Sequence, residues 1–292
     1  MIAPTIDLHM HSTASDGQLS PKELMKFAHS LGFKTVALAD HDTLAGLPEA
    51  RKQAMCLNME FIGACEISAG GSPEMHILGY GVDEGCDELQ ALFSRMRKAR
   101  ALRMEQFIHN LNERGVKISY EDVVTEAGNN ENAVGRPHLG RALVRLGYAS
   151  DLRDAFARYL VPGAPTFVTR EKVSIEEAIK TINAAKGAPV LAHPALLRQD
   201  LKSVEKLVVY MKKLGLVGLE CHHPSHDREK ASMYRRVANK HGLVITGGSD
   251  YHGGQVAIGQ PLPMPGDGLG FFCDAQAQLN RLKEAIDQIK MK

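Results

Sequence analysis

The chain has 292 residues, of which 35 are Lys or Arg and 34 are Asp or Glu, so its formal net charge is +1. Hydrophobic residues make up 44% and charged residues 24%, which is typical of a globular protein and excludes disordered and fibrous classes. The length suffices for one large α/β domain with an insertion, or for two small domains. A net charge so close to zero excludes a protein-wide basic field that would attract nucleic acid.

The sequence shows no feature of a secreted or membrane protein. Residues 1–10 lack the basic start and apolar core of a secretory signal, and no run approaches the roughly 18 apolar residues of a membrane span. Five cysteines, at positions 56, 65, 86, 221 and 273, are scattered and form no CxxC pair. We therefore expect a protein of the reducing cytoplasm, with no membrane association and no obligate protein partner.

Short β-rich segments alternate with amphipathic helical segments. Two of these helices begin with capping residues, Ser20 before Pro21 and Ser174 before Ile175. Repeated β-then-α units predict a parallel sheet, and polar residues at many strand ends favour a barrel with its active site at the C-terminal rim. His76 stands at the start of its segment, which predicts a reversed or distorted strand. The predicted strands are residues 5–10, 35–40, 60–68, 76–82, 189–193, 217–221 and 243–248.

Residues 87–165 break this alternation. The pattern predicts a long helix over 87–114, ending at Gly115, and shorter helices over 120–127, 137–146 and 152–159. Between residues 90 and 165 there are 12 basic and 8 acidic residues. We expect residues 1–86 and 166–292 to form the barrel and residues 87–165 to form a helical substrate cap. The alternative is that the arginines of the long helix form a solvated face, at positions 95, 97, 100 and 103.

The first predicted strand carries Asp7, His9 and His11 at a spacing of two residues. This spacing puts the three side chains on one face of a strand, roughly 6–7 Å apart. Two imidazoles so placed can chelate one divalent ion, and Asp16 follows in the adjoining loop. A single His-x-His pair is by itself more often incidental.

The same pattern recurs at the ends of five other predicted strands. For any one of them a structural histidine or an ordinary strand-end carboxylate is the simpler interpretation, but five independent occurrences favour a shared site. Imidazole and carboxylate without thiolate suit Mn²⁺, Zn²⁺ or Fe²⁺, and the number of ligands predicts a cluster of ions. The polar groups at these ends are Asp40-His41-Asp42, Glu66, His193, Glu220 with His222 and His223, and Asp250 with His252.

These motifs resemble those of the PHP (polymerase and histidinol phosphatase) family. The shared motifs are D-x-H-x-H at 7–11, D-H-D at 40–42, A-H-P at 192–194 and S-D-x-H at 249–252, with Asp16, Glu66 and His76 at single positions. The motifs follow the family order over nearly the whole chain apart from the helical insertion. The resemblance implies a distorted seven-stranded (β/α) barrel with a trinuclear metal centre.

The resemblance also implies which side chains hold each ion, and no family ligand position is substituted in this sequence. The first ion is expected at His9, His11, Glu66 and Asp250. Glu66 is expected to bridge to a second ion. The second ion's other ligands are His76 and His193, and the third ion's ligands are Asp16, His41 and His252.

Within the family, the size and the insertion with Gly135-Arg136-Pro137-His138 are most similar to the 3′,5′-nucleoside bisphosphate phosphatases, whose relatives also trim RNA from its 5′ end. The implied activity is hydrolysis of the 3′-phosphate of a substrate such as 3′-phosphoadenosine 5′-phosphate. Phosphate-ester hydrolysis is intrinsically very slow. Divalent ions accelerate it because they lower the pKa of bound water and neutralise charge on the phosphoryl oxygens. Mn²⁺ is the expected ion, with Zn²⁺ or Fe²⁺ as alternatives.

Three residues are predicted to act in catalysis: Glu66 beside the attacking metal-bound hydroxide, His193 on the leaving-group side, and His223 as a proton donor or phosphate ligand. Asp7 and Asp40 are expected to accept N–H bonds from the ligand imidazoles, as metal-bound histidines usually require.

Substrate discrimination requires positive charge beyond the metals. Arg136 is the first candidate because arginine binds phosphate through two parallel hydrogen bonds, and His138, Arg103 and His223 follow it. The alternative for Arg136 is a salt bridge within the insertion, and for His138 it is a structural role at a helix start.

Four other functions compete with the bisphosphate phosphatase. A 5′→3′ exoribonuclease acting on short RNA would share the metal core, although aromatic residues are only 5% of the chain. A histidinol phosphatase would have no use for a cap that recognises a second phosphate. A C–N-cleaving amidohydrolase often bridges its metals through a modified lysine, where this chain has Glu66. A non-catalytic PHP module of a polymerase would have a polymerase region attached.

Overall fold

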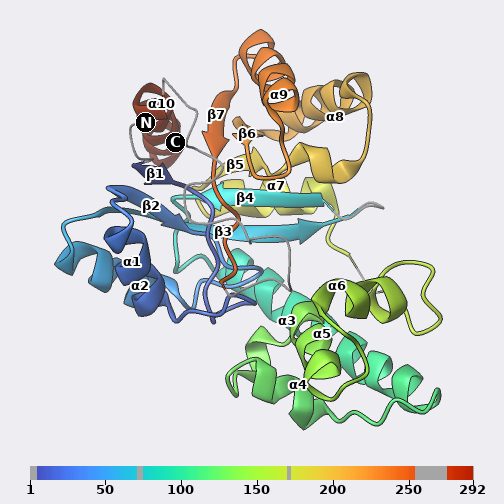
Figure 1. The fold of residues 1–292 in the computed structure, drawn as a ribbon. Helices are drawn as coiled ribbons and strands as arrows, with labels where there is room; N and C mark the ends of the chain where they lie inside the picture. The colour runs from blue at the N-terminus through green and yellow to red at the C-terminus, as the bar shows by residue number, and fades with distance from the viewer. Residues whose placement is uncertain (1–4, 71–74, 170–171, 254–274, 292) are drawn as a thin grey trace.

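The computed structural model describes residues 5–70, 75–169, 172–253 and 275–291. Its centre is a seven-stranded sheet in which the strands follow chain order (Figure 1). All seven strands lie within or next to the predicted segments. They are β1 (Ile6–Asp7), β2 (Thr35–Leu38), β3 (Glu60–Ala69), β4 (Met75–Tyr80), β5 (Ala188–Leu191), β6 (Gly218–His222) and β7 (Val244–Gly247).

Strand β4 runs against the direction of the other six. It pairs antiparallel with β3 and with β5, whereas all other pairs are parallel. Glu66 lies opposite Leu78, and Ser68 lies opposite His76. The start of β4 therefore lies at the edge where the other strands end. This confirms that the strand with His76 is reversed, and it explains why its polar residue comes first.

The first and last strands are joined by backbone hydrogen bonds. The Leu8 N–H donates to Gly247 O at 3.3 Å, and beyond the strands Asp250 N–H donates to His9 O at 2.8 Å. The His11 N–H donates to Tyr251 O at 2.9 Å. The sheet thus closes into a distorted barrel, as predicted. Strand β1 is shorter than the predicted 5–10 because residues after Asp7 pair with the segment that follows β7.

Helices cover the outside of the barrel, and their starts match the capping residues seen in the sequence. Ser20 and Glu23 form a reciprocal capping box at the start of α1, and Ser174 accepts the Glu177 N–H at the start of α7. These covering helices are α1 (Pro21–Ser30), α2 (Leu47–Cys56), α7 (Ile175–Ala184), α8 (Leu201–Leu214) and α9 (Arg228–Lys240), with a short 3₁₀ helix η3 (Pro194–Leu197).

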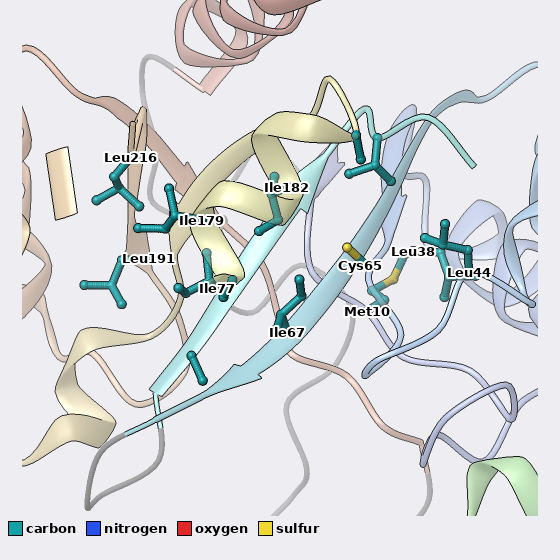
Figure 2. Packing of buried hydrophobic residues seen from close by; sticks show 14 of the residues in the cluster. Met10, Leu38, Leu44, Cys65, Ile67, Ile77, Ile179, Ile182, Leu191 and Leu216 are labelled. Carbon is teal, nitrogen blue, oxygen red and sulfur yellow. The ribbon is translucent and has the colours of Figure 1, made fainter. Parts of the chain in front are cut away.

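Two apolar clusters hold the barrel together, one on each face of the sheet. Between the sheet and its helices, Ile179 and Ile182 of α7 pack over Ile67 and Ile77 (Figure 2). Side chains that alternate with these along the strands form the inner cluster, which helix α10 (Ala275–Lys290) completes with Leu279, Leu282 and Ile286. Both faces of the sheet are thus buried.

The segment after β4 forms the predicted group of helices, which lies beside the sheet (Figure 1). The long helix α3 ends at Asn112, two residues before the predicted end. Its first half packs in the outer cluster through Phe93 and Met96, and its second half packs in a separate cluster through Phe107 and Leu111. The elements are α3 (Asp87–Asn112), α4 (Tyr120–Glu126), η1 (Glu131–Ala133), α5 (Arg136–Arg145), α6 (Leu152–Ala155) and a π-helical turn η2 (Phe156–Leu160).

Among the described residues, no helix is both long and apolar enough to cross a membrane. Four of the five cysteines, at positions 56, 65, 86 and 221, are free thiols, and the fifth, Cys273, lies outside the described residues.

Candidate metal centre

The inner face of the barrel changes from apolar to ionisable at the C-terminal rim. Along β3 the inward side chains are Ile62, Ala64 and then Glu66. Strand β4 runs the other way, so its rim residue His76 comes before the apolar Leu78. Because every strand presents its rim end to the same point, side chains far apart in sequence meet there. The nine predicted ligands all lie in this cluster: His9, His11, Asp16, His41, Glu66, His76, His193, Asp250 and His252.

The Glu66 carboxylate lies at the middle of the cluster and is fully buried. Its Oε1 is 2.9 Å from His76 Nδ1 and 2.9 Å from His193 Nε2. Its Oε2 is 3.0 Å from His41 Nδ1. The two oxygens thus face different histidines, which is the arrangement that a carboxylate shared between two ions needs.

A second group brings together the side chains expected at the first ion. The Nε2 atoms of His9 and His11 are each 3.3 Å from Glu66 Oε2. Asp250 Oδ1 lies 3.0 Å from His11 Nε2 and 3.5 Å from His9 Nε2. One candidate ligand atom from each residue falls within 4.8 Å of the others.

A third group lies on the other side of His11. His252 Nε2 is 3.2 Å from Asp16 Oδ1, and His41 Nε2 is 4.0 Å from Asp16 Oδ2. The rings of His11 and His252 stack with their centroids 4.1 Å apart. The predicted trio of Asp16, His41 and His252 therefore meets, with His11 as a fourth member.

The hydrogen bonding of the cluster fits the presence of bound cations. Buried polar atoms are almost always hydrogen-bonded, yet ten buried side-chain atoms in the described residues make no hydrogen bond. Seven of these ten belong to the cluster and converge on its interior. They are His9 Nε2, His11 Nδ1 and Nε2, Asp16 Oδ1, His41 Nδ1, Glu66 Oε2 and Asp250 Oδ1.

Electrostatics keep the cluster's carboxylates ionised despite their burial. Burial alone raises the pKa of Glu66, but the neighbouring imidazoles, first of all that of His76, outweigh it and hold that pKa well below its usual value. In the same way His9 and His252 hold the pKa of Asp250 well below its usual value. Ionised carboxylates are the form that binds metal ions.

Two histidines show opposite shifts within the same group. Burial lowers the pKa of His41 to about 3, more than the nearby Glu66 and Asp16 can offset, so this imidazole is neutral and its lone pair is available. Burial also opposes protonation of His252, but Asp16 and Asp250 outweigh it and raise its pKa to about 10. A raised pKa marks a position where positive charge is favoured, which a cation can supply in place of the proton.

Two proposed ligands hold backbone conformations that are rare outside glycine. The φ angles are 23° at His193 and 53° at Asp250. Such strained residues persist only where the surrounding structure fixes them, and they concentrate at functional sites.

Glu220 supports the cluster from below the rim. It is fully buried, its Oε1 lies 3.0 Å from His9 Nδ1, and its Oε2 accepts the backbone N–H of His193 at 2.7 Å. A carboxylate on the second ring nitrogen fixes the tautomer of a ligating histidine. The strand-end pattern identifies Glu220 as a polar rim residue, but nothing in the sequence indicates that its partner is His9, 211 positions away.

The two aspartates expected in that orienting role both accept hydrogen bonds from groups other than imidazoles. Asp7 Oδ1 accepts the backbone N–H groups of His9 and Ser249. Asp40 accepts hydrogen bonds from Ser12 and Ser15. Within the described residues the prediction that Asp40 accepts an imidazole N–H is wrong, because its carboxylate turns into the serine loop after His11.

A cavity of about 170 Å³ opens from the metal cluster toward the helical insertion. Among the predicted substrate residues, Arg136 and Arg103 line it, together with Arg100 and the Phe156 ring. The Arg136 guanidinium lies 6.0 Å from the centre of that ring. Arg103 donates through Nε to Val168 O at 2.9 Å.

The two histidines predicted to contact substrate are placed differently from each other. His138 is only 1% exposed, and its Nδ1 accepts the backbone N–H of Gly135, so it holds the start of α5. His223 Nδ1 accepts the Ser225 N–H, so its proton resides on Nε2, which lies 3.2 Å from Asp250 Oδ2. The structure therefore joins His223 to the cluster and gives His138 a structural contact.

Comparison with known proteins agrees with this geometry. The PHP domain matches residues 7–159. The chain belongs to the PHP family. It is a metal-dependent phosphoesterase.

Three similar proteins, two by sequence and one by structure, are named as enzymes that act on phosphate esters. A 5′-3′ exoribonuclease from Haemophilus influenzae is 36% identical over 84% of this chain and 89% of its own. A 3′,5′-nucleoside bisphosphate phosphatase from Chromobacterium violaceum is 33% identical over 85% of this chain and 87% of its own. The crystal structure of a protein described as a metal-dependent phosphoesterase, from Bifidobacterium adolescentis, superposes with a TM-score of 0.84 at 28% identity, over 97% of this chain and 96% of its own.

Proposed function

We propose that this enzyme removes the 3′-phosphate of nucleoside 3′,5′-bisphosphates, such as 3′-phosphoadenosine 5′-phosphate, and leaves a nucleoside 5′-monophosphate. The observation that carries the proposal is the cavity shared by the metal cluster and the insertion. Asp16, His41 and His76 line one side of it, and Arg103 and Arg136 line the other. A bisphosphate can place one phosphate at the metal cluster and its second phosphate at the arginines.

The nine clustered side chains are proposed to hold two or three divalent ions, with Mn²⁺ as the favoured ion. Such ions lower the pKa of water and neutralise charge on the phosphoryl oxygens. We assign Glu66 as the carboxylate shared between ions, since its two oxygens face different histidines. We further propose that residues 87–165 form the substrate cap, because they supply the arginines of the cavity.

Two histidines lie side by side next to the Glu66 carboxylate. His193 Nε2 is held against Glu66 Oε1, and the ring of His223 lies 5.1 Å from that of His193. His223 carries its proton on Nε2, which faces the cluster. We assign the His223 Nε2–H as a hydrogen-bond donor to the phosphate, and His193 as the residue that positions the phosphoryl group next to it.

A 5′→3′ exoribonuclease is the second candidate, favoured by the 36% identical relative of that name. Sequence-tolerant readers of single strands stack successive bases on aromatic rings. Phe156 is the one Phe, Tyr or Trp ring among the residues that line the described cavity. One ring serves a mononucleotide better than a strand, which ranks the exoribonuclease second.

Phosphate release from 3′-phosphoadenosine 5′-phosphate with Mn²⁺ tests the proposal. A 5′-phosphorylated RNA oligomer and histidinol phosphate are assayed in parallel, with an EDTA-treated control. The expected result is fast, EDTA-sensitive release that leaves adenosine 5′-monophosphate. Shortening of the RNA with the bisphosphate left intact would replace this proposal with the exoribonuclease.

A further inference from the structure

The four arginines expected to form one solvated face of α3 have different surroundings. Arg95 is at the surface and pairs with Glu177. Arg97 instead donates to Asp42 O at 3.3 Å, and Arg100 forms an ion pair with the Asp42 carboxylate. The side chain of Arg100 is only 13% exposed, and it lines the cavity next to the metal cluster. The solvated-face interpretation is therefore wrong for Arg100.

Asp42 ties Arg100 to the part of the barrel that carries the ligands. Its side chain is fully buried, and one carboxylate oxygen accepts the Ser68 N–H at 3.1 Å while the other receives Arg100. Its own N–H donates to Glu66 O at 3.0 Å. One carboxylate thus joins the loop of His41, the strand of Glu66 and the long helix of the insertion.

The Arg100 guanidinium is incompletely paired in this position. Its Nε is buried and has no hydrogen-bond acceptor in the described part of the chain. A buried donor without an acceptor costs free energy, and the cost is larger for charged groups. The cavity that Arg100 lines with His41, His76 and Ser68 is where an anionic oxygen can complete the pairing.

We propose that Arg100 binds the phosphoryl group that is hydrolysed, and that Asp42 is the positioning residue that holds it there. This inference rests on the proposed function for the substrate. Arg100 enters the cavity from α3 among ligating histidines, whereas Arg136 enters from the start of α5 beside Phe156. Arg100 therefore serves the reacting phosphate of any substrate, and Arg136 serves the second phosphate of the bisphosphate alone.

Two substrates separate these roles. Arg100→Ala is expected to lower kcat/KM by roughly 10- to 100-fold both for 3′-phosphoadenosine 5′-phosphate and for p-nitrophenyl phosphate, which has no second phosphate. Arg136→Ala is expected to lower it for the bisphosphate only. Arg95→Ala, on the same helix but in a surface ion pair, is the matched control and should change neither value.

Arg100→Ala also removes the arginine from the buried Asp42, so Arg100→Lys accompanies it, because lysine keeps the charge but loses the planar fork. Thermal melting checks that both variants fold. Asp42→Asn should show the same two-substrate loss to a smaller extent, and the double variant should lose no more than Arg100→Ala, since both act through one group.

A binding measurement gives a readout that does not depend on turnover. Titration calorimetry of inorganic phosphate into EDTA-treated protein is expected to show weaker binding for Arg100→Ala than for Arg95→Ala. Metal content after reloading with Mn²⁺ should equal that of the wild type. Unchanged kinetics in Arg100→Ala and Arg100→Lys, a loss confined to the bisphosphate, or a loss explained by missing metal would each overturn the proposal.

The design separates failure of this proposal from failure of the proposed function. If the wild type leaves the bisphosphate intact but hydrolyses RNA or p-nitrophenyl phosphate, the proposed function fails, whereas Arg100 should still matter for the substrates that are cleaved. If the wild type releases phosphate from the bisphosphate and Arg100 does not affect it, only the present inference fails.

Discussion

The barrel rim and the helical insertion both carry many charges, but they hold them in different ways. At the rim, fully buried carboxylates and imidazoles face one another, with seven of their buried polar atoms left without hydrogen bonds. In the insertion, most ion pairs lie at the surface, as between Arg145 and Asp122. Buried charges without partners are costly unless a ligand completes them, whereas surface pairs contribute little. The difference indicates that the charges of the rim serve to bind ions. Most charges of the insertion lie at its surface, and a few of its arginines line the cavity.

The largest effect is expected from Glu66→Gln, which removes a buried carboxylate that faces five imidazoles. The amide keeps the shape but loses the charge that is shared between the proposed ions, so we expect kcat to fall by at least about 10³-fold and metal content to drop. Activity assays and elemental analysis of the purified protein measure the two effects. Glu177→Gln, at an exposed pair in α7, is the control. Full metal content and normal activity in Glu66→Gln would refute its central role.

A smaller loss is expected from Glu220→Gln. Glu220 touches no proposed substrate position and acts through the ring of His9 and the backbone of His193. Partners of this kind typically change metal affinity or activity by about 10- to 100-fold. A metal titration, followed by recovery of activity at high Mn²⁺, checks the expectation. If excess Mn²⁺ restores nothing, Glu220 does not work through metal binding.

The rim and the insertion also differ in how tightly the backbone is packed, which two glycines can show. A Cβ on Gly248 would lie 2.4 Å from the backbone nitrogen of His9, so Gly248→Ala must shift the first ligand strand. A Cβ on Gly115, which has φ of +79°, would meet nothing within 4 Å, so Gly115→Ala bears only the backbone strain of about 1–2 kcal/mol. Denaturant unfolding and metal content should change together in Gly248→Ala, whereas Gly115→Ala should keep its metal. Equal losses of stability and metal in the two variants would show that the rim backbone is no more tightly packed than that of the insertion.

The same contrast explains which features could be predicted from the sequence. The seven strands and the convergence of the strand-end polar residues followed from local patterns, because strand ends of one barrel must meet at one rim. The full set of nine, with Asp16 and His76, followed only from the resemblance to the PHP family. The surroundings of Arg100 could not be predicted, since arginines spaced three apart on a helix are usually solvated and its partner Asp42 lies 58 positions away. The contact of Glu220 with His9 likewise depends on which strands adjoin across the barrel.

The last expected effect concerns stability and not activity: a pH dependence in the insertion that comes from His138. Burial, and after it the charge of Arg141, lower the pKa of His138 from 6.5 to about 3, while the neutral Nδ1 accepts the Gly135 N–H. Between these two values the unfolded chain binds a proton that the folded chain does not, so the free energy of unfolding must fall as the pH falls. From pH 7 to pH 5 the loss amounts to about 2 kcal/mol for a group shifted this far.

His138→Gln isolates this contribution, because a glutamine oxygen can accept the Gly135 N–H and does not titrate. In EDTA-treated protein the variant should lose less stability between pH 7 and pH 5 than the wild type, as measured by urea unfolding. His29→Gln, at an exposed position of α1, is the control and should follow the wild type. An identical pH slope in His138→Gln and the wild type would show that the acid sensitivity belongs to the rim alone. In that case the insertion would not respond to protons, and only the ionisable cluster would couple pH to the fold.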